Sequence, residues 1–360
     1  MKVFLFVMGF SALLGGLDRI AGNRLGLGKA FEEGMRALGP QALSMAGILC
    51  IAPLMAQGAA YLAPLCRAIG MDPAALASPL ALDMGGYQMA VTLADDPAAG
   101  RFFGVLAGAI AGCTLSFTIP AGMGLYGAAD QRLFARGILY GLIAMPIGLL
   151  AGALTMGIAI AQALWLCAPL LLLAVMFAAL LHAFPRQTAA GFAAYAALLR
   201  VIATLGLALG AFQHISGVVL LPGMTPLSES LSVVAAIGIA LTGSLPAAEL
   251  LRRALRRPLA ALGDGLGIGG DGVLSLLLLY VNVTPGLASL PGISARGKVV
   301  ASAFAVSAAS CLTAHLAFTL AMEPQMAGPM IAGKTAGALA AAAMALLLTR
   351  GMDGGEAQDV

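Results

Sequence analysis

The sequence predicts an all-α membrane protein with several spanning segments, for three reasons. Hydrophobic residues make up 61% of the chain, charged residues make up 10%, and the mean hydropathy is +0.98, whereas a soluble domain carries about 25% charged residues. Residues 137–185 contain no charged residue and are long enough for two spanning helices. Backbone that meets lipid must satisfy its own hydrogen bonds, so the spanning segments are expected to be helical.

Apolar segments separated by short linkers follow one another along the whole chain. They lie near residues 3–21, 37–62, 73–94, 102–126, 137–158, 160–184, 189–213, 230–251, 272–291, 299–321 and 328–349. We interpret residues 1–158 as an N-terminal transmembrane repeat, 159–188 as a linking transmembrane helix and 189–350 as a C-terminal transmembrane repeat. Residues 351–360 are predicted to form a disordered acidic tail.

The two repeats are inferred from short matches that keep a common order. "IGMD" at 69–72 resembles "IGGD" at 268–271, an offset of 199 residues. The same offset pairs Asp83 with Asn282, Thr114 with Thr313, and Ser116 with His315. The third segment then corresponds to the ninth and the fourth to the tenth. Duplicated halves with interrupted segments at matching places are typical of secondary transporters.

Loop charges indicate that the third and ninth segments, 73–94 and 272–291, are re-entrant hairpins. If every segment spans, the loop lysines and arginines divide almost evenly between the two sides. If these two segments return to the side they started from, three basic residues lie on one side of the membrane and fourteen on the other. This is the asymmetry that the positive-inside rule requires. This predicts nine spans, inverted repeats, an outer N-terminus and a cytoplasmic C-terminus. The alternative is a full span with an unwound centre.

The centres of these two segments carry the first candidate site residues. Asp83 is the one carboxylate deep within an apolar segment, and Gly85 and Gly86 follow it, while Asn282 and Thr284 occupy the centre of the ninth segment. Irregular backbone at membrane depth is tolerated only where protein buries it or it lines a watery cavity. An intramembrane aspartate is therefore expected to be functional. The simpler interpretation is that it caps a half-helix.

Two helix breaks that meet would enclose a small polar site suited to a small cation with hydrogen-bonding groups. Tyr87 lies one helical turn from Asp83 and offers a cation–π face, and His315 is a titratable group in an apolar segment. The remaining candidates are Gln88, Thr114, Ser116 and Thr313. Each of these side chains also has an ordinary structural interpretation as a packing residue or a hydrogen-bonded core residue.

Several long stretches are specific enough to suggest a family. They are "FEEGMRALGPQALSMAGILCIAPLM" (31–55), "LDMGGYQMA" (82–90), "ARGKVVASAFAVSAASCLTAHLAF" (295–318) and "GKTAG" (333–337). They resemble the ethanolamine transporters of ethanolamine-utilization operons, the EutH family, and the resemblance covers nearly the whole chain. One departure is the "AH" at 314–315, where the family has "DH", so a carboxylate is missing at that point.

The resemblance implies a multi-pass permease of the bacterial inner membrane that admits ethanolamine or a similar small amine. Ethanolamine is mostly an ammonium ion at neutral pH and carries one hydroxyl group. Asp83 would pair with the ammonium, and Asn282, Thr284, Thr114 or Thr313 would bond the hydroxyl. The expected partners are this amine and the lipid bilayer, and a homo-oligomer is compatible with the sequence. The alternative function is an ion-coupled carrier for another small amine or amino acid.

The sequence disfavours an enzyme, a metalloprotein and a nucleic-acid-binding protein, and no cofactor is expected. The three histidines and five cysteines lack metal-ligand spacing. The glycine-rich stretch 267–272 follows no strand and lacks the Lys-Ser/Thr of a phosphate-binding loop. The formal net charge of +3 is too small to indicate nucleic acid.

Overall fold

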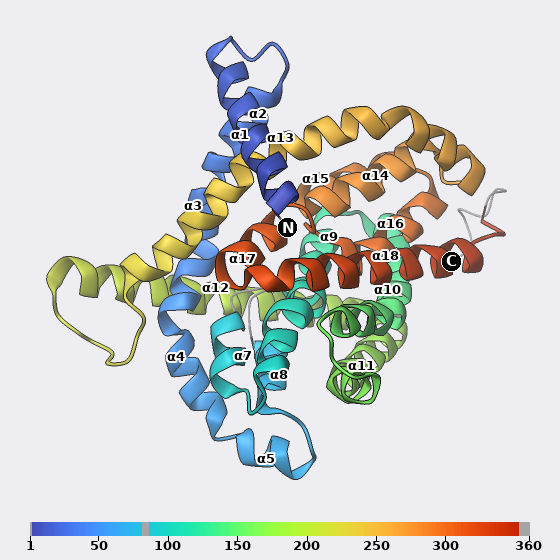
Figure 1. Cartoon of the computed structure of the whole chain (residues 1–360). Coiled ribbons are helices and arrows are strands. Elements are labelled where there is room, and N and C mark those ends of the chain that lie inside the picture. The colour runs from blue at the N-terminus through green and yellow to red at the C-terminus, as the bar shows by residue number, and fades with distance from the viewer. Residues whose placement is uncertain (1, 81–85, 353–360) are drawn as a thin grey trace. The chain divides into compact units, whose positions relative to one another are not determined.

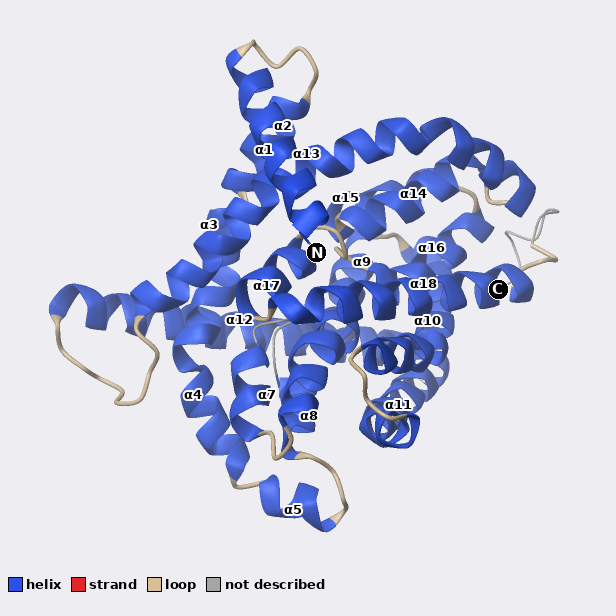
Figure 2. Ribbon diagram, in the orientation of Figure 1, coloured by secondary structure: helices blue, strands red, loops and turns tan. Residues whose placement is uncertain are grey.

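The computed structural model describes residues 2–80 and 86–352, and these form helices joined by turns, with no strand among them (Figure 2). The predicted all-α class is confirmed. The chain divides into two compact units that interleave along the sequence. The first contains Met1–Gly108, Ala196–Leu251 and Leu312–Gly328, and the second contains Ala109–Tyr195, Arg252–Cys311 and Pro329–Val360.

The first unit is built mainly from the N-terminal third of the chain (Figure 1). Its complete helices are α1 (Lys2–Ile20), α2 (Leu27–Arg36), α3 (Leu38–Gln41), α4 (Gly47–Ala60), α5 (Ala63–Ala68), α6 (Ala77–Leu80), α7 (Tyr87–Leu93), α8 (Pro97–Arg101) and α17 (Ala314–Met322). Short 3-10 and π turns, η1 (Ala42–Ala46), η2 (Pro73–Leu76) and η7 (Pro324–Met326), connect them. The unit also takes in part of α12 (Pro185–Ser216) and of α13 (Leu227–Leu266).

The second unit contains the long central helices and the broken helices of the C-terminal part. Its elements are η5 (Thr114–Thr118), α9 (Ile119–Leu125), α10 (Ala128–Thr155), α11 (Ile160–Ala183), α14 (Gly269–Val281), α15 (Val283–Ser289), η6 (Leu290–Gly292), α16 (Ala295–Ala308) and α18 (Ala327–Leu348). The π-helix η4 (Phe102–Gly112) crosses the boundary between the units. Such wide turns are rare and often occur at functional places.

Among the described residues, six helices are long and apolar enough to cross a membrane by length and composition. They cover Pro97–Met123, Ala129–Thr155, Ile160–Leu181, Ala190–Ser216, Leu227–Leu255 and Pro324–Leu348. The chain is therefore a polytopic membrane protein. The other predicted spans fall on α1, on the shorter apolar helix α4, and on α16 and α17, which follow each other with an interruption.

Glycines allow the helices of each unit to approach closely, as is common between helices in membranes. In the first unit, a methyl group on Gly47 of α4 would collide with the Ala203 carbonyl oxygen of α12. In the second unit, a methyl group on Gly137 of α10 would collide with the Val299 carbonyl oxygen of α16. Larger residues at these positions would force the helices apart.

Both predicted hairpins turn back on themselves. In the ninth segment the Ser289 hydroxyl of α15 donates to Ser275 Oγ of α14 at 2.8 Å, so α15 folds back along α14. In the third segment the Asp72 carboxylate accepts hydrogen bonds from the backbone N–H groups of Asp95 and Asp96, which join the two ends of the segment. The ends of each segment therefore lie close together, and the return of each segment to one side of the membrane stays a prediction.

The division into repeats, 1–158 and 189–350, with the linking helix 159–188, remains a prediction, as does the inverted relation between the repeats. Of the predicted tail, residues 353–360 lie outside the described residues.

Candidate functional site

The helix break in the ninth segment lies where the sequence predicts it, at Asn282. This residue is extended, with φ −149° and ψ 122°, between the end of α14 and the start of α15. Its side-chain oxygen accepts a hydrogen bond of 3.1 Å from the Thr284 N–H, which is the geometry of a helix N-cap. Thr284 itself is exposed. The following proline, Pro285, lies in the first turn of α15, where its missing N–H costs little.

A second break, which the sequence reasoning missed, interrupts the tenth segment after α16. Ser310 adopts a left-handed conformation, with φ 52°. Its N–H donates to the Leu279 carbonyl at 3.0 Å, and its hydroxyl oxygen accepts from the Val283 N–H at 3.0 Å. Ser310 therefore joins the break in the tenth segment to the break in the ninth and satisfies backbone groups that a continuous helix would have paired.

Two predicted hydroxyl groups of the fourth segment are buried in the second unit and bonded to backbone. Thr114 Oγ1 lies 2.8 Å from the carbonyl oxygens of both Ile110 and Val306. Ser116 Oγ donates to the Gly112 carbonyl at 2.7 Å. Both hydroxyl groups therefore give their hydrogen to the protein itself, and their remaining capacity is as acceptors.

Gly86 and Tyr87 are buried at the start of α7 in the first unit, while Asp83 and Gly85 lie outside the described residues. The Tyr87 hydroxyl donates to Glu323 Oε2 at 2.9 Å. Its ring meets Phe318 of α17 edge-on, with 6.2 Å between centroids. Tyr87 therefore connects α7 to α17, and its hydroxyl already has a carboxylate partner.

Thr313 and His315 lie at the start of α17 in the same unit, each with 1% of its surface exposed. The His315 carbonyl accepts a hydrogen bond of 2.7 Å from the Thr319 hydroxyl, one turn further along the helix. Both side chains are therefore part of the buried interior of the first unit, and their role in binding substrate stays a prediction.

Gln88 lines an open cavity of about 110 Å³ in the first unit. The cavity lies between α4, α7 and the start of α13, and it is also lined by Glu229. The sequence analysis did not select Glu229, and an acid at the start of a helix is not by itself a signal of a site.

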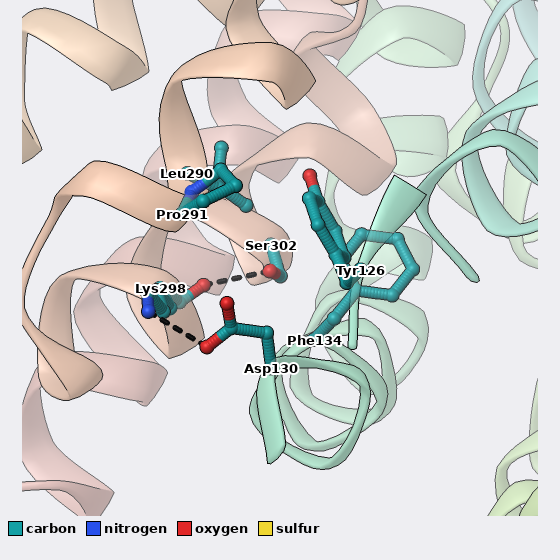
Figure 3. Close-up of a pocket in the computed structure, with 7 residues that line it drawn as sticks. All are labelled: Tyr126, Asp130, Phe134, Leu290, Pro291, Lys298 and Ser302. Atoms are coloured by element: carbon teal, nitrogen blue, oxygen red, sulfur yellow. Dashed lines mark hydrogen bonds and ion pairs between the residues drawn. The ribbon is translucent and has the colours of Figure 1, made fainter. Parts of the chain in front are cut away.

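A narrow pocket in the second unit contains a charged pair (Figure 3). Lys298 Nζ of α16 lies 2.7 Å from Asp130 Oδ1 of α10, and both side chains are largely buried. Tyr126 closes the same pocket and donates its hydroxyl hydrogen to the Leu287 carbonyl at 2.7 Å.

A buried lysine completes the polar groups of the second unit. Lys334 of α18 has no exposed surface, and its Nζ donates to the Ala109 carbonyl at 2.5 Å. On the same helix the Thr335 hydroxyl lies 2.6 Å from the Tyr280 hydroxyl of α14. Charged side chains within membrane segments are costly and usually functional. The signal for this lysine in the sequence is the "GKTAG" stretch, which places Lys334 within the apolar segment 328–349.

The predicted site residues thus fall into two groups, one in each unit. Gly86, Tyr87, Gln88, Thr313 and His315 belong to the first unit, and Thr114, Ser116, Asn282 and Thr284 belong to the second. Among the described residues, no group of three or more histidine, cysteine or acidic side chains could hold a metal ion. The hydroxyl and amide side chains described above can accept and donate hydrogen bonds, and the charged side chains can bind a group of opposite charge.

The long apolar helices, the two hairpins and the buried polar groups define a polytopic α-helical membrane protein with interrupted helices, the architecture of many secondary transporters. The chain belongs to the EutH family. The family model described as "Ethanolamine utilisation protein, EutH" matches residues 1–348.

Similar proteins extend over nearly the full length of the chain. A protein of Listeria monocytogenes named "Probable ethanolamine permease EutH" is 34% identical, with 98% of this chain and 95% of the relative covered. A protein of Escherichia coli with the same name is 31% identical, with 96% and 95% covered. "Uncharacterized protein YxeR" of Bacillus subtilis is 39% identical, with 96% and 94% covered. No solved structure matches the chain.

Proposed function

We propose that this protein is a permease that carries ethanolamine across the bacterial inner membrane. The observation that carries the proposal is the similarity, over nearly the full length of both chains, to proteins named as probable ethanolamine permeases. A polytopic helical protein with broken helices is the architecture that such a function needs. A polar substrate that crosses the bilayer core needs hydrogen-bonding groups in place of its hydration water. Helix breaks supply them, because they free backbone N–H and C=O groups from helical hydrogen bonds.

The chemistry of ethanolamine fits the side chains that we propose for the site. An ammonium ion needs an anion or several acceptor oxygens, and a hydroxyl group needs both a donor and an acceptor. We assign the ammonium to Asp83, and the part of Asn282 and Thr284 in binding the hydroxyl stays a prediction from the sequence. Gln88 and Tyr87, one turn beyond Asp83, are supporting positions. Because Tyr87 already donates to Glu323, its proposed contribution is the ring face.

Uptake into liposomes tests the function itself. Purified protein is reconstituted without sodium and with protonophore present, and labelled ethanolamine is added outside. We expect the label to equilibrate faster than in protein-free liposomes and to stop at equal concentrations on both sides, as facilitated uptake requires. Accumulation that needs a sodium or proton gradient would indicate the alternative, an ion-coupled carrier. Equal rates with and without protein would contradict ethanolamine transport.

The Asp83→Asn variant tests the assignment of the ammonium. Asparagine caps a helix about as well as aspartate, so a purely structural Asp83 predicts uptake at the parent rate. A carboxylate that binds the ammonium predicts a folded variant with little uptake, and partial uptake for Asp83→Glu. Asp264→Asn, the same change at an exposed position of α13, is the matched control and should transport as the parent does.

A further inference from the structure

The open cavity of the first unit has the composition of a cation-binding site. Its volume is about 110 Å³, enough for a few water-sized groups, since one water occupies about 30 Å³ of liquid. Gln88 and Thr92 of α7, Thr225, and Glu229 of α13 supply its polar lining. Among the described residues that line the space, one is a carboxylate and none is a lysine or arginine, so its charge favours a small cation over an anion.

The Glu229 carboxylate is available to a ligand. Within the described part of the chain, it accepts no hydrogen bond and forms no ion pair, although the backbone N–H of Glu229 is bonded to the Pro226 carbonyl. It is also the one charged side chain between Val201 and Ala248. A cation in the cavity would therefore meet an acid that has no competing partner.

A proline supplies a second acceptor at the wall formed by α4. Pro53 lies inside this helix and lines the cavity together with Leu49, the residue four positions before it. Proline has no N–H, so the Leu49 carbonyl lacks the donor that a regular helix would give it. A primary ammonium group has several N–H donors. It can donate to the Glu229 carboxylate and also to the Leu49 carbonyl oxygen, which has no helical N–H partner.

The wall that carries Glu229 is fixed to α4 rather than left as a mobile loop. The Thr225 N–H donates to the Cys50 carbonyl at 2.9 Å, and the Cys50 thiol donates to Ser230 Oγ at 3.3 Å. Beneath them, Cys50 packs in a buried cluster with Leu227 and Val234. The backbone that carries Glu229 is therefore held against α4 before any ligand arrives, which reduces the entropy cost of binding.

We propose that this cavity is a recognition site for a small primary ammonium compound that carries a hydroxyl group, distinct from Asp83 and Asn282 and sharing only Gln88 with the residues assigned above. It rests on the proposed function for the identity of the ligand, ethanolamine. Glu229 binds the ammonium, and the Gln88 amide or the Thr225 hydroxyl binds the substrate hydroxyl. In the predicted orientation the chain before α13 lies outside the cell, so this site receives the substrate on its way in.

The test measures binding and uptake separately. Thr92→Cys places a thiol on the exposed side of α7 at the cavity, and a membrane-impermeant maleimide is applied to intact cells. We expect labelling, and we expect ethanolamine to slow it in a concentration-dependent way. The protection should require about ten-fold or more ethanolamine when Glu229→Gln is added, because a hydrogen bond to a charged group is lost. Glu33→Gln, the same change on exposed α2, should leave the protection unchanged.

Ligand analogues and uptake separate this proposal from the proposed function. Ethylamine should protect the thiol and ethylene glycol should not, because Glu229 selects the ammonium. Protection that depends on Glu229 supports the site even if liposomes show no ethanolamine uptake. Parent uptake together with protection that is the same in Glu229→Gln, or absent, overturns the site and leaves the function standing. A Thr92→Cys thiol that is not labelled from outside overturns it as well.

Discussion

Arg67 and Asp95 form a two-point ion pair, with Arg67 Nε 2.8 Å from Asp95 Oδ2 and Arg67 Nη2 2.7 Å from Asp95 Oδ1. These residues flank the third apolar segment, residues 73–94. A straight helix of that length would hold its ends about 30 Å apart. The ion pair therefore requires the two ends of the third segment to lie close together. The Arg67 guanidinium lowers the pKa of Asp95, and the pair therefore stays ionised through the neutral range.

The first prediction concerns the orientation of this pair. Single cysteines are placed at Ala98, just beyond Asp95, and at Ala261 of α13, and intact cells are treated with an impermeant maleimide. We expect Ala98→Cys to be labelled and Ala261→Cys to be protected until the membrane is permeabilised. The reason is that the hairpin model leaves only three basic residues on the outer side.

Each other outcome has a definite meaning. Labelling of Ala261→Cys together with protection of Ala98→Cys, with Ala68→Cys labelled, would require every segment to span, against the ion pair that joins the ends of the third segment. Labelling of Ala261→Cys with both Ala68→Cys and Ala98→Cys protected would reverse the proposed orientation. The Ala68→Cys variant, exposed in α5, serves as the control, because it is expected outside in both models.

The helical class, the hairpins and the break at Asn282 were predictable, because each leaves a signal in the composition of short stretches of the sequence. Charge-free runs predict helices that span, and "VNVTPG" predicts the break at Asn282, since asparagine and proline disturb helical bonding within a few residues. The charge count predicts the hairpins because the positive-inside rule depends on loops alone.

The break at Ser310 and the cavity at Glu229 were not predictable in this way. No glycine or proline marks residues 309–313, and the left-handed Ser310 is held by Leu279 and Val283, which lie about one segment earlier in the chain. Glu229 becomes a candidate only because α4 and α7 pack beside it. Tertiary contacts of this kind leave no periodic signal in a single sequence.

The second prediction separates two roles of Tyr87. Because its hydroxyl is bonded to Glu323, Tyr87→Phe should lower the stability by about 1.5 kcal/mol, the lower end for a hydrogen bond to a charged group. The ring remains against Phe318, so we expect most ethanolamine uptake to persist. Tyr87→Ala removes the ring, and we expect this variant to lose most of its ethanolamine uptake. Thermal unfolding in detergent and liposome uptake measure the two effects.

A matched control is available in Tyr61, whose side chain is 87% exposed. Tyr61→Phe should change neither stability nor uptake. If Tyr87→Phe abolished uptake without a change in melting temperature, the hydroxyl itself would belong to the transport pathway, and the structural account of the Tyr87–Glu323 bond would be wrong.

The third prediction concerns Asn282 as a cap and as a site residue. Asn282→Ala removes the bond to the Thr284 N–H and should cost about 1 kcal/mol of stability. Asn282→Asp keeps a capping oxygen and should restore the melting temperature. If the side-chain amide also binds substrate, both variants will raise the half-saturation concentration for ethanolamine. An unchanged half-saturation concentration in both would limit Asn282 to the capping role.

The fourth prediction concerns the ion pair between Lys298 and Asp130, whose side chains are 15% and 28% exposed. Removing either partner should destabilise the protein by about 1.5–3 kcal/mol, the range for hydrogen bonds to charged groups. The two losses should differ. Asp130 lies in the first turn of α10, where the helix dipole favours an acid, whereas Lys298 lies at the start of α16, where the dipole disfavours a base.

Asp130→Ala should therefore cost more than Lys298→Ala, because it leaves a largely buried lysine facing the positive end of its own helix. The double variant should lose less than the sum of the single losses, since neither charge is then left without its partner. Thermal unfolding of the four proteins in detergent gives the coupling, and Lys29→Ala, at an exposed position of α2, controls for the loss of a positive charge. Strictly additive losses would mean that the contact between α16 and α10 contributes no net coupling, and equal single losses would remove the helix dipole from the explanation.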